Sequence, residues 1–102
     1  MLVNSFNISV ISKIEFLGWN GFLMDQPLYQ KAQTFITHAN VFKLDEQVAN
    51  KTIELRQQYK IKTPDAIIAA TALTYNLGIA TNNIDDFKCL GVETLSIEIK
   101  NQ

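Results

Sequence analysis

The chain has 102 residues, of which 47% are hydrophobic and 19% are charged, and its formal net charge is −1. This length and balance predict a single folded domain over residues 1–102 and exclude a disordered chain or a membrane protein. The small negative charge also excludes nucleic-acid binding through bulk electrostatics. Such binding would need a local basic patch. The fold could gather lysines into one patch or leave them scattered on a solvated surface; they lie at positions 13, 43, 60, 62 and 88.

Targeting and redox signals are few. Residues 1–20 have neither a basic segment nor a small-residue cleavage site, and no apolar run approaches the roughly 20 residues of a membrane span. Cys89 is the only cysteine, so an internal disulfide is excluded and a buried, unreactive thiol is expected. These features predict a cytoplasmic protein.

Short β-branched and apolar runs predict strands in four places. They lie at residues 8–11, 41–44, 79–81 and 92–99. Helical patterns fall between them, at residues 12–17, 25–38, 45–59 and 64–76, with a turn and short helix at 82–87. Strands that alternate with helices predict an α/β fold with a mainly parallel sheet flanked by helices, because parallel neighbours need crossover connections.

Two of the helices show one apolar face. Asp25 is the expected N-cap of the first, and its buried face is predicted to contain Leu28, Ala32, Phe35 and Ile36. Asp45 is the expected N-cap of the second, and its core-facing stripe is predicted to contain Val48, Thr52, Leu55 and Tyr59, with Ala49 and Ile53 beside them.

The helix after residue 62 differs because it is apolar or small on every side, which predicts a helix inside the fold. Thr63 is the expected N-cap and Pro64 suits the first helical position, where its missing N–H costs nothing. Asp65 then lies at the positive end of the helix dipole. A carboxylate fixed at the rim of a buried helix is a candidate functional group.

Further carboxylates follow the predicted strands. Glu15 comes after the first strand, and Asp85 and Asp86 follow the third, in the same turn as Asn83. In parallel α/β folds, functional sites form where strands end and helices begin. Carboxylate and amide oxygens favour Mg²⁺ or Mn²⁺ over zinc, and such a metal site supports phosphodiester hydrolysis.

Each carboxylate also has a purely structural interpretation. Ser12 and Glu15 have the spacing of a capping box, in which the glutamate folds back onto the Ser12 backbone. Asp65 in a first turn is favoured by the helix dipole, and Asp85 or Asp86 could simply cap a short helix. Residue spacing alone leaves both interpretations open.

Three blocks of sequence resemble the PIN-domain family, and the VapC-like ribonuclease toxins in particular. They are Ser-Val-Ile-Ser-Lys-Ile-Glu at residues 9–15, Lys-Thr-Pro-Asp-Ala-Ile-Ile-Ala-Ala-Thr-Ala at 62–72 and Thr-Asn-Asn-Ile-Asp-Asp-Phe at 81–87. The resemblance implies a Mg²⁺-dependent endoribonuclease with a small antitoxin partner and a tendency to form homo-oligomers. It assigns Glu15 and Asp65 to the family's second and third acidic positions and the last position to the turn of Asn83 and Asp86.

The start of the chain departs from the family, whose members open with a strand that carries an Asp-Thr-Asn motif. Residues 1–7 contain no carboxylate, which indicates an N-terminally truncated PIN-like fold without its first acidic residue. The alternative function is therefore a catalytically inactive PIN remnant that binds an antitoxin or its own copies. Two arrangements would close the sheet at its centre. Another chain could fill the gap, through exchange of elements within a homo-oligomer or through a partner strand, or residues 2–11 could pair directly with the strand at 79–81.

Overall fold

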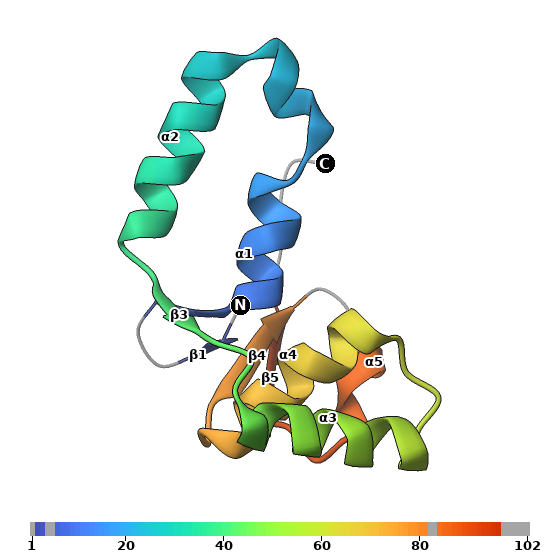
Figure 1. Ribbon diagram of the computed structural model, residues 1–102. Helices are drawn as coiled ribbons and strands as arrows, with labels where there is room; N and C mark the ends of the chain where they lie inside the picture. Colours follow the sequence, from blue (N-terminus) through green and yellow to red (C-terminus); the bar gives the residue numbers. More distant parts are fainter. Residues whose placement is uncertain (1, 4–5, 82–83, 97–102) are drawn as a thin grey trace.

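Strands and helices alternate along the chain in the computed structural model, which describes residues 2–3, 6–81 and 84–96. The elements are β1 (Leu2–Val3), β2 (Asn7–Ser9), α1 (Val10–Leu17), the 3₁₀ helix η1 (Asn20–Met24), α2 (Gln26–Thr37), β3 (Asn40–Phe42), α3 (Glu46–Gln58), α4 (Thr63–Thr74), β4 (Gly78–Thr81), α5 (Ile84–Lys88) and β5 (Thr94–Ser96) (Figure 1). The described part of the chain contains no helix with the length and apolar character needed to cross a membrane.

The five strands form one sheet in the order β3-β2-β1-β4-β5. Strands β2 and β3 are parallel, β4 and β5 are parallel, and β1 is antiparallel to both of its neighbours. Four of the five strands therefore run in one direction, which confirms the predicted mainly parallel sheet. The predicted strand positions are correct to within about three residues, except that residues 97–99 lie outside the described part.

Strand β1 closes the centre of the sheet. Leu2 pairs with Asn7 on one side and with Ile79 on the other, and Val3 pairs with Gly78. The Leu2 side chain is fully buried. Of the two arrangements expected from the sequence, the direct pairing with the strand at 79–81 is the one observed.

The core lies between the sheet and the helices α3 and α4. Helix α4 buries Ala66, Ile67, Ala69, Ala70, Thr71 and Ala72, which confirms that it runs inside the fold. Two threonines are buried without cost to hydrogen bonding, because the Thr52 and Thr71 hydroxyls each donate to the carbonyl four residues earlier, at 2.7 Å. Leu2, Val48 and Ile79 complete the centre of this core.

Two helices begin earlier than predicted. Ser9 caps α1, since its hydroxyl accepts from the Ile11 N–H at 3.0 Å directly after β2. Ser12 is therefore inside α1, and the predicted capping box between Ser12 and Glu15 is wrong. Helix α4 has Lys62 as its N-cap and Thr63 as its first residue, so the prediction of Thr63 as the cap is also wrong by one position.

Helix α4 stops at a left-handed residue. The Leu77 N–H donates to the Ala72 carbonyl at 2.8 Å, and Asn76 between them has a φ of 57°. This is the bond pattern of a Schellman motif, in which asparagine can replace glycine. The predicted end near Asn76 is correct, but Gly78, expected at the stop, is instead the first residue of β4.

The segment of residues 10–37, which we call the arm, contains α1, η1 and α2 and extends away from α3, α4 and α5 (Figure 1). Only half of the predicted apolar face of α2 is covered: Ala32 and Ile36 are buried, whereas Leu28 is 42% and Phe35 52% exposed. The helices α3, α4 and α5 lie too far from α2 to cover the rest of that face. Ile53 on α3 is exposed too, which corrects its predicted place beside the core stripe.

Candidate functional site

Three aspartates lie together in a cavity of about 400 Å³ at the start of α4. Asp65 comes from α4, and Asp85 and Asp86 come from α5, about twenty positions further along the chain. The cavity is also lined by Lys60, Ile61, Lys62 and Cys89. The fold thus brings together two of the predicted site residues, Asp65 and Asp86.

Local structure explains how Asp65 is held. The Lys62 carbonyl accepts from the Ala66 N–H at 2.9 Å and starts the helix, which places Asp65 in its first turn. Pro64 takes the second helical position, where its missing N–H would have had no partner within the helix in any case. The side chain is half-buried and lies close to the positive end of the helix dipole.

Helix α5 presents its two aspartates to the cavity. Phe87 is buried and anchors this short helix against the core, while Asp85 and Asp86 in its first turn are exposed. Asn83, the predicted amide ligand of the same turn, lies outside the described residues.

Glu15 is placed differently. It is exposed on α1 and does not line the cavity. Strands β2 and β4 are nevertheless separated only by β1, which corresponds to about 10 Å. Because these two strands point the same way, α1 and α5, which follow them, leave from the same edge of the sheet.

The donor set fits a hard divalent cation. Mg²⁺ is usually held by one or two protein carboxylates together with water and substrate phosphates, and Asp65 and Asp86 supply such a pair. Among the described residues, no three His, Cys, Asp or Glu side chains are arranged to hold a metal ion. A cation in this cavity would need oxygen atoms from water and substrate in addition to the aspartates.

Sequence reasoning did not assign the two lysines or the cysteine to the site. Of the lysines that the fold could have gathered, Lys60 and Lys62 do line the cavity. Cys89 is exposed, which corrects the predicted buried thiol. Phe87 within α5 and Leu90 after it are both buried, and Cys89 between them is exposed. The apolar residues on either side were the signal for this orientation.

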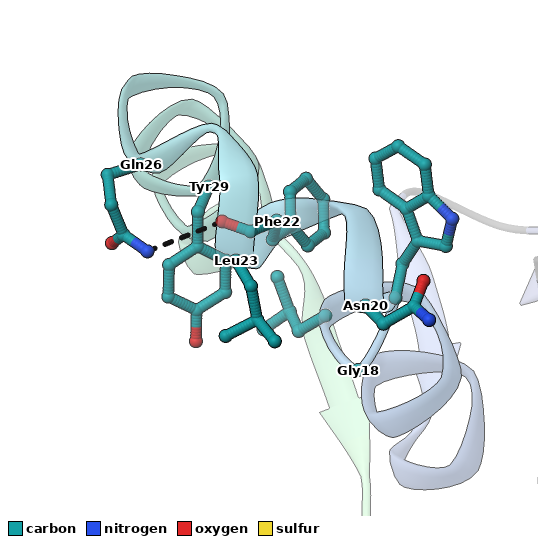
Figure 2. A pocket seen from close by; sticks show the side chains of 8 residues that line it. Gly18, Asn20, Phe22, Leu23, Gln26 and Tyr29 are labelled. Atoms are coloured by element: carbon teal, nitrogen blue, oxygen red, sulfur yellow. Dashed lines mark hydrogen bonds between the residues drawn. The ribbon is translucent and has the colours of Figure 1, made fainter.

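A second, apolar pocket of about 350 Å³ lies at the tip of the arm. Figure 2 shows the ring of Phe22 next to Leu23 and Tyr29, with Gln26 donating to the Phe22 carbonyl at 3.3 Å. Trp19 meets Phe22 edge to face, with ring centroids 5.1 Å apart. This pocket contains no charged side chain and lies away from the aspartates.

Comparison with known proteins identifies the fold. A family model described as PIN domain matches residues 26–91, a range that includes Asp65 and Asp86 but not Glu15. The chain belongs to the PIN-domain family. No curated protein gives a significant match.

Solved structures agree with this assignment. A toxin–antitoxin complex from Klebsiella pneumoniae is 29% identical, with a TM-score of 0.78 over 95% of this chain and 79% of that chain. VapBC2 from Rickettsia felis, bound to a DNA fragment from its promoter, is 22% identical with a TM-score of 0.78, over 91% of this chain and 75% of that chain. VapBC-1 from nontypeable Haemophilus influenzae is 21% identical with a TM-score of 0.74, over 94% of this chain and 78% of that chain. The last two support the fold alone, and the family match confirms the PIN-domain resemblance predicted from the three sequence blocks. PIN-domain proteins of this type generally use a divalent metal ion.

Proposed function

We propose that this PIN-domain protein is a Mg²⁺- or Mn²⁺-dependent endoribonuclease of the VapC type, which hydrolyses phosphodiester bonds in RNA. One observation carries the proposal: Asp65 and Asp86, which the sequence resemblance assigns to acidic positions of the family, line one cavity at the start of α4. A cation held there would lower the pKa of a bound water and neutralise charge that develops on the phosphate.

The proposed roles follow the position of each residue. Asp65 is the main metal ligand, because the six buried residues of its helix fix its position. Asp86 is a second ligand. Glu15, at the same edge of the sheet, would orient the attacking water or act as a further ligand, and Asn83 would supply an amide oxygen.

Substitution of Asp65 tests this proposal. Asp65→Asn keeps the shape of the side chain but removes its charge, so metal-dependent RNA cleavage should fall by about a hundredfold or more. Mn²⁺ binding, measured by calorimetry, should weaken in parallel, while the circular dichroism spectrum stays unchanged.

The matched control is Glu54→Gln, an exposed acid on α3 that pairs with Lys51 and lies outside the cavity. It should leave both cleavage and Mn²⁺ binding intact. Cleavage by Asp65→Asn at the wild-type rate would refute the assignment of this site.

A specific observation also favours the second candidate function, binding of an antitoxin-like protein or of a second copy of the chain. Leu23 and Met24 at the tip of the arm are 78% and 91% exposed, and contiguous exposed apolar side chains are typical of protein interfaces. The K. pneumoniae chain comes from a toxin–antitoxin complex. We propose that the arm binds such a partner or a second copy, and that the protein acts in the cytoplasm, where RNA is available. This binding would persist in an inactive protein, so Asp65→Asn separates the two functions.

A further inference from the structure

The aspartate cavity has a second kind of charge. Lys60 and Lys62 line it from the link between α3 and α4. Among the described residues, the ion pair within 4 Å is the one between Lys51 and Glu54. Neither Lys60 nor Lys62 therefore forms an ion pair with an aspartate of the cavity. Two ammonium groups and three carboxylates therefore share this cavity without pairing.

The fold forces this orientation of the lysines. Tyr59 and Lys62, at the two ends of the link, have extended backbone angles. Alternate residues of an extended segment face opposite sides, and here Tyr59 and Ile61 pack against the core. Lys60 and Lys62 consequently face outward on the same side, beside the aspartates.

The charge balance of the cavity indicates what these lysines could bind. Three carboxylates and two ammonium groups leave a net formal charge of −1, which repels a polyanion. A divalent cation on the aspartates reverses the sign to +1. With the cation bound, the cavity could hold one phosphate through the cation. The free ammonium groups, which act as point charges, could hold the neighbouring phosphates.

We propose that Lys60 and Lys62 position the RNA strand by binding backbone phosphates next to the phosphodiester that is cut. This inference rests on the proposed ribonuclease function and names the substrate contacts of that site. The lysines are positioning residues: they hold the strand and take no part in the transfer of protons.

A double variant tests the proposal. Lys60→Gln with Lys62→Gln removes both charges but keeps the length of most of each side chain. In steady-state cleavage of a single-stranded RNA, KM should rise about tenfold while kcat stays within about twofold of wild type. Mn²⁺ binding, measured by calorimetry, should not weaken, because the aspartates are intact and the cavity loses two positive charges.

The dependence on salt gives a second readout. Binding of a fluorescent phosphorothioate RNA, which keeps the backbone charge and is hydrolysed slowly, is measured by anisotropy over a range of salt concentrations. The slope of log affinity against log salt should become shallower by about 0.7 for each lysine that contacts a phosphate, or about 1.4 for the pair.

The control pair is Lys31→Gln with Lys43→Gln, which changes the net charge equally but lies outside the cavity. If both pairs give the same KM and salt slope, the phosphate-binding role is refuted, even where metal binding and cleavage uphold the ribonuclease. That role is equally refuted if the cavity lysines affect only the binding of a protein partner. If wild type neither binds Mn²⁺ nor cleaves RNA, yet its RNA binding depends on Lys60 and Lys62, the ribonuclease proposal fails and the phosphate contacts stand.

Discussion

Helices α2 and α4 are each 12 residues long, yet the fold treats them in opposite ways. Helix α4 buries six residues between α3 and the sheet, whereas α2 buries only Ala32 and Ile36. Helix α4 is apolar or small on every side, whereas α2 has one apolar face and its neighbours cover only half of that face. The half of the chain built on α4 supplies stability and the aspartate cavity, and the arm supplies an exposed apolar surface.

The largest effect on stability is expected for a substitution in the buried core. Leu2→Ala removes a fully buried side chain at the centre of the sheet and should lower the free energy of unfolding by about 2–4 kcal/mol, measured by urea denaturation. Leu23→Ala in the exposed arm is the same chemical change and should alter the free energy of unfolding by less than about 0.5 kcal/mol. Equal effects of the two substitutions would mean that β1 does not close the sheet.

A smaller effect is expected at the caps of the two halves. Asp45 caps α3 by accepting from the Val48 N–H at 2.8 Å, and it also accepts from the Tyr75 hydroxyl at the end of α4. The hydrogen bond from Tyr75 lowers the pKa of Asp45 below its ordinary value of 3.8, and the bond from the Val48 N–H makes a smaller contribution. The same bond to Asp45 raises the pKa of Tyr75. The aspartate therefore stabilises the fold above pH 3.8, and this contribution is lost as the pH falls through the lowered pKa.

The variant Asp45→Asn keeps a good capping residue but cannot become a carboxylate. It should unfold at a lower temperature than wild type at pH 7, and the difference should shrink as the pH falls below 3.8, followed by thermal melts. Asp25→Asn is the control, since Asp25 caps α2 through the Leu28 N–H in the arm. A pH-independent difference for Asp45→Asn would show that the bond to Tyr75 does not link α3 and α4 in solution.

The smallest effect on stability is expected at the tip of the arm. Leu23→Ser with Met24→Ser should change the free energy of unfolding by less than about 0.5 kcal/mol, because both side chains are already exposed. The same variant should lose self-association in light scattering, or binding to an antitoxin-like partner. Ile53→Ser, at an exposed apolar position outside the arm, should keep that binding. If the arm variant still associates, the tip of the arm is not the binding surface for a partner.

Local chemistry accounts for the parts of this fold that could be predicted. Asp25 and Asp45 cap helices as expected, because the capping bond joins residues only three apart. The small and apolar residues of α4 required burial whatever their neighbours. The candidate site was predicted in part: Asp65 was identified at the start of its helix and Asp86 after a predicted strand, and the fold brings both to one cavity, which Glu15 does not line.

Predictions failed where two nearby groups competed or where the neighbour was unknown. Ser9 and Ser12 are both suitable caps, and the end of β2 decides for Ser9. The two-residue strand β1 has too little sequence to be recognised, and only its pairing with Asn7 and Ile79 defines it. Lys60 and Lys62 belong to the cavity because α5, distant in sequence, packs beside the link that carries them.

By itself, then, the sequence determined the alternation of helices and strands, the helix caps set by aspartates and the burial of α4, since each depends on residues a few positions apart. The tertiary structure alone decided how the sheet closes at its centre, which face of α2 remains exposed and which charges share the aspartate cavity. These features depend on contacts between residues far apart in the chain, and the spacing of residues does not specify which distant surface will cover them.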